Sequence, residues 1–375
     1  MKFRRLTLLF SCLLICQSGT MARASRQDIV VTNRGAASIS VIDAVSHSVT
    51  HYPLPPGNAA SEPMYATFNP TSHQLYVGDR GNNRVIRFDA RNYSVLGEIP
   101  VGAGVFHMWA EPSLAQLWVN NDVDKSISII NTSTNNVITT TLTPADLNAL
   151  GGRPHDVILD PIAPFAYVTM IGVTGASDYV VKYSTETFLE GDRAAVGKDP
   201  HLSLTATNNH LYVPTQNANE VRVLDRSTLD FVTSIPIANA HGAGMMPDGS
   251  RFYTTNIAGG GTDGLLTINT ATNTKIDTDS TPFGTPHNIV ISPDRTELFL
   301  THSGATSTSV SIFDLNGAGS PDNPVFSESV SVQSNPWGIV AFTIVPEPNT
   351  AVLIALTLAV SAISSLSVNV KSRQG

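Results

Sequence analysis

The chain has 375 residues, of which 42% are hydrophobic and 14% charged, and 30 acidic residues against 22 basic ones give a net charge of −8. This acidic balance, without a cluster of Lys and Arg inside the chain, excludes sequence-independent nucleic-acid binding, because phosphates are repelled by such a surface. The apolar fraction and the scattered Gly and Pro residues also exclude a disordered protein.

Residues 1–24 have the pattern of a secretory signal peptide. A basic start is followed by the apolar residues 6–16 and by Ala22-Arg23-Ala24, which places small residues around a cleavage site. Both cysteines of the chain, Cys12 and Cys16, lie in this segment, so the exported protein has neither a thiol nor a disulfide. A lipoprotein modified at Cys16 is an alternative, which the bulky Ile15 disfavours. Removal of residues 1–24 leaves 18 basic against 30 acidic residues, a net charge of −12.

The body of the chain repeats a short β-type segment seven times. Its clearest copies are residues 74–79 (QLYVGD), 210–215 (HLYVPT) and 251–256 (RFYTTN). The third residues of the seven copies are Val30, Tyr76, Trp118, Tyr167, Tyr212, Tyr253 and Phe299. Their spacing of 41 to 49 residues is typical of a four-stranded propeller blade.

Further β runs and turns flank each copy. Alternating side chains, β-branched residues and Pro/Asp/Gly turns predict strands almost throughout, with a single helical turn at residues 144–149. The exported chain begins on the second strand of a blade, and residues 336–342 supply the missing first strand. The predicted fold is therefore all-β: a seven-bladed β-propeller of four-stranded antiparallel blades, with the ring closed by the C-terminal strand.

These repeats resemble those of the YVTN-repeat family of seven-bladed β-propellers. The L-Y-V-containing segments and the preceding Pro-His turns, such as residues 286–293, carry the resemblance, which covers roughly residues 28–344. It implies a bacterial or archaeal surface or periplasmic propeller. It implies no particular activity, because propellers host many unrelated functions.

One position of the innermost strand is rich in histidine. In the family's architecture this strand lines the central channel, and aligning the blades on the Pro that opens it brings seven residues into register. They are Met64, His107, His155, His201, His241, His287 and Trp337. In this alignment Phe106 and Ala240 replace the opening Pro in two blades.

The histidines allow three interpretations. Imidazoles converging from several blades suit Zn²⁺ or copper, and Met64 would favour copper; His302, expected nearby, would add a sixth imidazole. Alternatively, the same face binds a ligand through these histidines and Trp337, together with polar residues at the ends of the repeated segments: Asn33, Asp79, Asn121 and Asn256. In the third interpretation, the histidines bond the backbone and hold the innermost strands in register.

The remaining polar residues point to no further chemistry. His47, His51, His73 and His210 are predicted on turns or outer strands, at the surface. The carboxylates Asp79, Asp122, Asp156 and Asp263 could meet and bind Ca²⁺, but a solvated acidic face is the preferred interpretation. No G-x-S-x-G, phosphate-binding loop or H-E-x-x-H motif is present, so no residue is assigned a catalytic role.

The C-terminus has the pattern of a sorting signal. Residues 346–375 contain an uncharged run, residues 351–370, which is long enough for a transmembrane helix, followed by Lys371 and Arg373. With the preceding Val345-Pro346-Glu347-Pro348, this segment resembles the bacterial PEP-CTERM signal, although the basic tail is sparser than usual in that family. The resemblance implies transient anchoring in the inner membrane and processing by an exosortase-type enzyme. A permanent membrane anchor is the alternative.

The sequence thus predicts a signal peptide (residues 1–24), a propeller (25–345) and a sorting segment (346–375). Our first functional hypothesis is a non-enzymatic binding or scaffold protein of the envelope or extracellular matrix, whose partner is another envelope or matrix protein or a polysaccharide. The second is a Cu- or Zn-dependent lyase, lactonase or redox enzyme that uses the histidines as ligands or general base.

Overall fold

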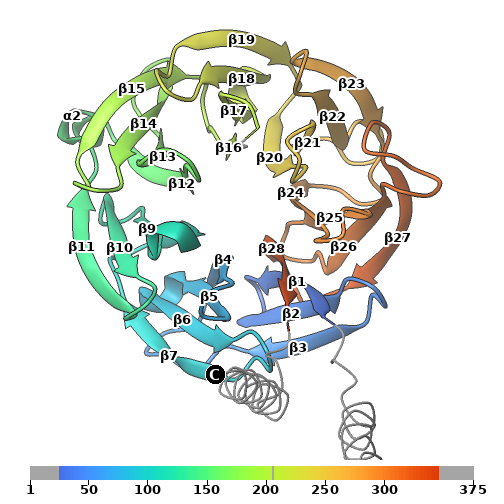
Figure 1. Cartoon of the computed structure of the whole chain (residues 1–375), viewed down its shortest axis with the longest axis horizontal. Helices are drawn as coiled ribbons and strands as arrows, with labels where there is room; N and C mark the ends of the chain where they lie inside the picture. The colour runs from blue at the N-terminus through green and yellow to red at the C-terminus, as the bar shows by residue number, and fades with distance from the viewer. Residues whose placement is uncertain (1–24, 205–206, 346–375) are drawn as a thin grey trace, which may run out of the picture. The chain divides into compact units, whose positions relative to one another are not determined.

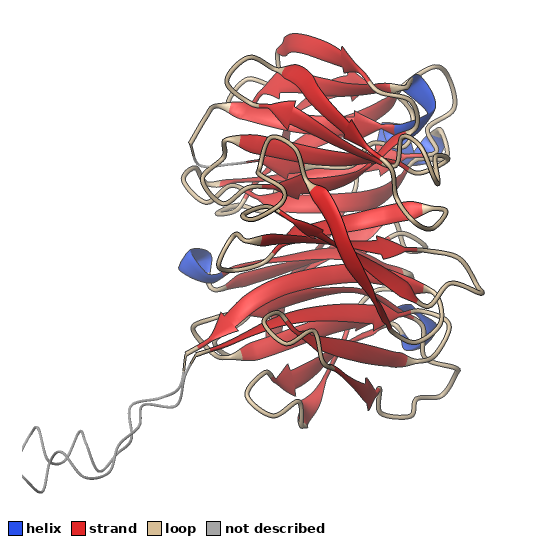
Figure 2. Ribbon diagram, turned by 90° about the vertical axis from the view of Figure 1, so that its right-hand side faces the viewer, coloured by secondary structure: helices blue, strands red, loops and turns tan. Residues whose placement is uncertain are grey.

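Seven four-stranded antiparallel sheets, the blades, surround a central axis in the computed structural model (Figure 1). The structure describes residues 25–204 and 207–345. The strands cross between two faces that carry the connecting loops (Figure 2). The predicted fold class is confirmed, including the number of blades and the four strands in each.

We number the blades 1 to 7 along the chain and give their strands from the innermost outward. Blade 1 consists of β28 (Pro336–Ile344), β1 (Arg26–Asn33), β2 (Ser38–Asp43) and β3 (Val49–Pro53). Blade 2 consists of β4 (Pro63–Asn69), β5 (Gln74–Asp79), β6 (Arg84–Asp89) and β7 (Val95–Pro100). Blade 3 consists of β8 (Val105–Glu111), β9 (Gln116–Asn121), β10 (Ser126–Asn131) and β11 (Asn136–Leu142). Blade 4 consists of β12 (Arg153–Leu159), β13 (Phe165–Ile171), β14 (Asp178–Ser184) and β15 (Glu190–Val196).

The last three blades follow the same order. Blade 5 consists of β16 (Ser203–Leu204), β17 (His210–Thr215), β18 (Glu220–Asp225) and β19 (Phe231–Pro236). Blade 6 consists of β20 (Ala240–Met245), β21 (Arg251–Asn256), β22 (Leu265–Asn269) and β23 (Thr274–Asp279). Blade 7 consists of β24 (Pro286–Ile291), β25 (Glu297–His302), β26 (Ser309–Asp314) and β27 (Val325–Ser331).

Helices are short in the described part of the chain. The predicted turn at residues 144–149 is confirmed as α2 (Ala145–Ala149), and three 3₁₀ turns follow strand ends: η1 (Arg80–Asn82), η2 (Pro112–Leu114) and η3 (Gln216–Ala218). None of these described helices has the length and apolar character needed to cross a bilayer. The predicted signal peptide and sorting segment lie outside the described residues.

The hydrophobic core lies between neighbouring blades. One cluster joins Trp118 and Ile129 of blade 3 to Val157, Val168 and Val181 of blade 4, all of them buried. The two central strands of each blade bury nearly every residue, because both of their faces are covered. Burial of both faces therefore fixes how the blades stack and where the innermost strands stand.

Where the repeated residue is tyrosine, its hydroxyl links the blade to the next one. The hydroxyl of Tyr76 donates to Oδ1 of Asn135 at 2.9 Å, and that of Tyr212 donates to Oδ1 of Asn273 at 2.8 Å. Both asparagines have left-handed backbones, with φ of 59° and 53°, in the outer turn of the following blade. Phe299 of blade 7 has no hydroxyl, and its ring instead meets the His47 ring edge-on at 5.9 Å.

The C-terminal strand closes the ring. The amide of Gly338 in β28 donates to Thr32 Oγ1 at 2.8 Å, and the amide of Arg34 donates to the carbonyl of Asn335 at 3.0 Å. The prediction that residues 336–342 complete the first blade is confirmed. Without β28, the inner edge of β1 would be open to pairing with other chains.

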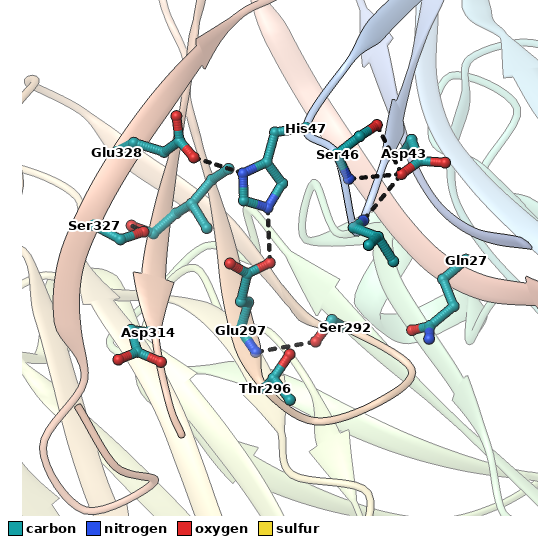
Figure 3. Close-up of polar contacts among 12 residues, drawn as sticks. Gln27, Asp43, Ser46, His47, Ser292, Thr296, Glu297, Asp314, Ser327 and Glu328 are labelled. Carbon is teal, nitrogen blue, oxygen red and sulfur yellow. Dashed lines mark hydrogen bonds and ion pairs between the residues drawn. The ribbon is translucent and has the colours of Figure 1, made fainter. Parts of the chain in front are cut away.

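His47 also joins the two ends of the ring (Figure 3). Its Nε2 lies 2.9 Å from Glu297 Oε2 and its Nδ1 lies 2.6 Å from Glu328 Oε1, both in blade 7. Partial burial lowers the pKa of His47, but the hydrogen bonds and charges of the two glutamates outweigh it and raise the pKa above its ordinary value of 6.5. His47 lies on a turn, as predicted, but its side chain is only 16% exposed because this turn packs against blade 7.

We expect this contact to stabilise the fold in a pH-dependent way. The raised pKa means that the stabilisation is complete below about pH 6.5 and is lost as the pH rises through the higher pKa of the folded state. The effect is about 0.5 to 1 kcal/mol, because Glu328 is half exposed. Thermal unfolding between pH 5 and 9 measures it. His47→Asn, which tolerates the left-handed backbone, should remove the effect, and equal pH profiles for the two proteins would contradict this assignment.

Two carboxylates on the outer strand of blade 6 also make stability fall as the pH rises, but in a lower pH range. Asp277 and Asp279 lie on the same face of β23, and their Oδ2 atoms are buried without a hydrogen-bond donor. Burial, followed by the charge of Asp277, raises the pKa of Asp279 to about 7.

Because the folded protein retains a proton that the unfolded chain releases near pH 3.8, stability should fall as the pH rises from about 4 to 7. Asp277→Asn should raise the free energy of unfolding at pH 8 by about 1 kcal/mol, a value reduced because Asp279 is half exposed. Urea unfolding at pH 5 and pH 8 measures this change. The assignment fails if Asp277→Asn shifts stability equally at both pH values.

Candidate functional site

A β-bulge opens the innermost strands and sets the direction of two side chains in each. Pro63, Val105 and Pro286 each pair with the last residue of the neighbouring strand, and the register then shifts over the next two residues. We call these two residues the first and second bulge positions. The first positions are Met64, Phe106, His155, His201, His241, His287 and Trp337; the second positions are Tyr65, His107, Asp156, Leu202, Gly242, Asn288 and Gly338.

The predicted alignment is wrong in blade 3. Because Val105 pairs with Asn121, Phe106 and not His107 takes the first position, and His107 takes the second. The sequence alignment placed Phe106 at the position of the opening Pro, which Val105 in fact occupies. The residues of blade 3 were therefore aligned one position too far along the chain. His107 nevertheless reaches the other histidines from this second position.

The rings of five histidines and Trp337 form an unbroken series of contacts, which we call the ring cluster. Its neighbouring centroids are 4.0 to 5.2 Å apart, in the order His107, His155, His201, His241, His287 and Trp337. Tyr65 stacks on His107 with the centroids 3.5 Å apart. The structure thus brings together all five histidines that the sequence pattern selected.

Four histidines of the ring cluster have a buried ring nitrogen without a hydrogen-bond partner. These nitrogens are the Nε2 atoms of His107, His155, His201 and His241. Burial, together with neighbouring imidazoles, lowers the pKa values of His155 and His241 well below 6.5; burial also lowers that of His107. These three imidazoles are therefore uncharged at neutral pH. A buried polar atom without a partner costs stability, and these nitrogens are available to a ligand that would satisfy them.

Asp156 fixes the orientation of the cluster at its His107 end. Its Oδ1 lies 2.9 Å from His107 Nδ1, its Oδ2 lies 3.8 Å from His201 Nδ1, and it accepts the amide of Leu202 at 2.8 Å. Burial raises the pKa of Asp156, but hydrogen bonds from His107 and His201, and the charge that these rings carry at acid pH, outweigh it and hold the pKa below its ordinary value. With Nδ1 donating to this carboxylate, His107 presents the lone pair of Nε2.

The assignment of Asp156 to a solvated acidic face is therefore wrong. Only 8% of this residue is exposed. It occupies the second bulge position of blade 4, directly after His155, and the bulge turns it toward the channel instead of toward solvent.

The geometry of three histidines suits a metal ion. One ring nitrogen from each of His107, His155 and His201 lies within 4.8 Å of the other two. Tetrahedral ligands about 2.0 to 2.1 Å from Zn²⁺ lie roughly 3.4 Å apart, so small side-chain rotations would bring these nitrogens onto one ion. Three protein ligands leave a fourth position open, which is typical of catalytic zinc. A second group of three potential metal ligands shares His201 with the first and consists of Asp199, His201 and His241.

A cavity of about 550 Å³ extends along the central channel from this group of residues. His107, Asp156 and His201 line one end, and Glu111, Leu159 and Pro247 line the other end of the innermost strands. Between them the walls are mostly apolar. None of the described residues that line the cavity is a Lys or Arg.

Other residues of the predicted site have structural partners. Both ring nitrogens of His302 are engaged, Nδ1 by the carbonyl of Gly284 at 3.0 Å and Nε2 by Ser311 Oγ at 2.8 Å. Met64 is fully buried in the hydrophobic cluster between blades 1, 2 and 3. Neither residue enters the metal site that we propose below.

The predicted polar ligand-binding residues also bond within the protein. Asn33 and Asn121 bond the serines of the neighbouring strand, with their amides in either orientation. Asp79 pairs with Arg84 at 2.9 Å, and Asn256 accepts the amide of Gly259 at 3.0 Å. These four residues lie at the ends of the repeated strands, as predicted, but their side chains bond neighbouring strands and turns instead of remaining available to a ligand.

The ring cluster differs at its two ends. At the Trp337 end, the guanidinium of Arg34 lies 4.7 Å from the Trp337 ring centre, and Nδ1 of His287 contacts the Asn288 amide at 2.7 Å. At the other end stand the carboxylates Asp156 and Asp199. A cation is therefore favoured at the His107 end, away from Arg34.

Gly242 shows how closely the innermost strands approach one another around the ring. A Cβ atom at this second bulge position would lie 2.2 Å from the carbonyl oxygen of His287. Sequence reasoning missed Gly242, and it considered Asp156 only as a calcium ligand or a solvated carboxylate. The signal that was available is their position directly after a ring histidine.

Comparison with known proteins supports the fold. No protein-family model matches the chain, and no curated protein is detectably similar to it in sequence, so the YVTN and PEP-CTERM assignments stay predictions. Among solved structures, the periplasmic gluconolactonase PpgL of Pseudomonas aeruginosa is 17% identical with a TM-score of 0.66, covering 86% of this chain and 100% of the other.

Two further structures have the same architecture. A Bacteroides fragilis protein described as a candidate 6-phosphogluconolactonase is 13% identical with a TM-score of 0.66, covering 87% of this chain and 100% of the other. Hydrazine synthase of Kuenenia stuttgartiensis is 16% identical with a TM-score of 0.60, covering 76% and 96%. At these identities the likeness establishes the fold alone, a seven-bladed β-propeller shared with lactonase-like enzymes and other propeller proteins.

Proposed function

We propose that this propeller is a zinc-dependent hydrolase of small uncharged esters or lactones, with His107, His155 and His201 as the metal ligands. The observation that carries this proposal is the convergence of three buried imidazoles, each with an Nε2 atom that no hydrogen bond satisfies. Without the thioether of Met64 the site lacks the soft ligand that was expected to favour copper, and three imidazoles with one open position are a ligand set of catalytic zinc. Met64 lies instead in the core.

The surroundings of the three ligands support catalysis. A zinc ion held by His107, His155 and His201 would bind a water molecule and lower its pKa to about 7, which would supply a nucleophile at neutral pH. Asp156 orients His107 and strengthens it as a ligand. The cavity beside His107 and His201 gives a small substrate access to the open position.

The channel lining restricts the substrate. Asp156 and Glu111 are the acidic groups among its described residues, and no cation faces them. Apart from the metal ion, a phosphorylated substrate would therefore find no cationic side chain to bind its phosphate, whereas a neutral lactone needs none. The structural likeness to a gluconolactonase supports this reaction class.

The binding or scaffold function remains a second prediction, together with its envelope or matrix partner. It requires residues displayed on the channel-mouth face, but His201, His241 and His287 are buried. The lyase and redox alternatives also remain predictions. We favour hydrolysis because it needs only the metal, water and an open position.

Metal content and activity test this proposal together. Protein made without a histidine tag should retain about one equivalent of Zn²⁺ and hydrolyse an unphosphorylated sugar lactone, while chelation should abolish both properties. His155→Leu should lose the metal and the activity, while His302→Leu should keep both. Less than about 0.1 equivalent of any transition metal after Zn²⁺ loading and dialysis would overturn the proposal.

We also propose that the protein is exported to the periplasm, cell surface or matrix. The signal-peptide pattern of residues 1–24 and the sorting pattern of residues 346–375 support export, and one structural neighbour is a periplasmic enzyme. Mass spectrometry of the protein from its native host tests this. A chain that still begins at Met1 would contradict export, and one that ends at Gly375 would contradict exosortase-type processing.

A further inference from the structure

We infer that the ring cluster holds a second metal ion, bound by Asp199 and His241 beside the zinc of the proposed function, so that the complete site is dinuclear. This inference rests on the proposed function for the first ion. The second position has its own ligands, which the first does not use. One ligand atom from each of Asp199, His201 and His241 lies within 4.8 Å of the other two.

His241 is oriented as a ligand. Its Nδ1 lies 3.1 Å from the amide oxygen Oε1 of Gln216, which can only accept a hydrogen bond, so Nδ1 carries the proton. The lone pair is therefore on Nε2, which is buried and has no hydrogen-bond partner. The residue itself is only 6% exposed. This arrangement matches the orientation of His107 by Asp156, with an amide in place of the carboxylate.

Asp199 is fixed in place by its backbone. It has a left-handed conformation with φ of 58°, which is uncommon for a residue other than Gly. Its amide donates to Oδ2 of the buried Asp178 at 2.9 Å, and Lys198 pairs with the other oxygen of Asp178 at 3.1 Å. These contacts hold Asp199 so that Oδ1 lies 3.8 Å from His155 Nε2.

The two ligand groups are neighbours. His201 belongs to both, and the contact between Asp199 and His155 connects them a second time. Because a neutral imidazole has one lone pair, His201 binds one ion at a time; it could bridge both ions only after loss of its remaining ring proton to solvent. Solvent completes the coordination of the second ion, since the Asp199 side chain is 30% exposed.

The second ion should bind more weakly than the first. Two divalent ions bring four positive charges, while Asp156 and Asp199 supply two negative ones, so the first ion repels the second. The second position is also nearer to solvent than the first. The two positions should therefore fill in order: the first ion binds to His107, His155 and His201, and the second ion then binds to Asp199 and His241.

Stoichiometry tests this inference. Titration of Zn²⁺ into the metal-free full chain, made without a histidine tag, should show two equivalents, with the second dissociation constant at least tenfold higher. Asp199→Asn and His241→Leu should each reduce the stoichiometry to one and leave the first dissociation constant within about threefold. Asn adopts a left-handed backbone readily and keeps the amide that bonds Asp178, so Asp199→Asn should fold.

A matched control comes from the same ring. His287 stands at the same bulge position as His241 but belongs to neither ligand group, so His287→Leu should still bind two equivalents. With Cu²⁺ as the probe, electron paramagnetic resonance should detect spin coupling in the wild type at two equivalents and uncoupled copper in Asp199→Asn.

Each outcome separates the two proposals. One equivalent in the wild type, lost in His155→Leu, overturns the second ion and leaves the zinc site intact. No binding in the wild type overturns both. Two equivalents that persist in both Asp199→Asn and His241→Leu overturn the second ion's assignment to these ligands.

Discussion

Replacing His155 by leucine is expected to stabilise the metal-free protein while abolishing metal binding. In the metal-free state, Nε2 of His155 is buried without a hydrogen-bond partner, and removing such a group relieves a desolvation cost. We expect the free energy of unfolding to rise by about 1 kcal/mol. Urea denaturation in the presence of a chelator measures this change, and the wild type should regain the advantage when Zn²⁺ is added.

His302→Leu is the matched control for this prediction. His302 is also a buried histidine at the same end of the blades, but both of its ring nitrogens are hydrogen bonded. Its replacement leaves Ser311 without its partner and should cost about 1 to 3 kcal/mol. If His155→Leu destabilises the metal-free protein as strongly as His302→Leu, the ring histidines serve the fold and the metal assignment is wrong.

Asp156→Asn is expected to weaken the first metal site by about 10- to 100-fold, because the carboxylate orients His107 and raises its basicity. Competition with a chelator of known affinity measures the loss. The Asp156→Asn variant should also have lower activity at every pH, because His107 would no longer be held in one orientation toward the zinc. The effect should not be rescued by Asp156→Glu, because the longer side chain would move the carboxylate out of the position in which Asp156 accepts the Leu202 amide.

Asp160→Asn separates this effect from a loss of stability. Asp160 is also buried in blade 4, four residues further along the chain, where it pairs with Arg226 Nε at 3.0 Å and accepts the amide of Ala163. Its replacement should cost about 3 kcal/mol of stability and leave metal affinity unchanged. Equal metal affinities for Asp156→Asn and the wild type would contradict the role assigned to Asp156.

The repeat period and the residue patterns were sufficient to predict the fold. Seven copies of one β segment predicted seven blades, and the absence of a first strand before Asp28 predicted closure by residues 336–342. Such patterns succeed because burial on both faces dictates side-chain character along every central strand. The link from Phe299 to His47 was not predictable, because it depends on a contact between the two ends of the chain.

The site was predicted less completely than the fold. A single histidine position recurs in the sequence, which selected the right five imidazoles, but the β-bulge adds a second inward position that the pattern does not reveal. Asp156 and the true register of His107 both depend on that bulge. His302 was misleading because it lies at the same end of the blades, and only side-chain contacts show that its nitrogens are engaged.

Closure of the ring by β28 determines when blade 1 can form during synthesis and export. Blade 1 is assembled from both ends of the chain, so it cannot form until residue 344 has been synthesised and, in an exported protein, translocated. Contacts of such high sequence separation form late and slowly. An incomplete chain thus lacks Trp337 and leaves the inner edge of β1 unpaired, and closure of the ring should follow complete translocation rather than accompany it.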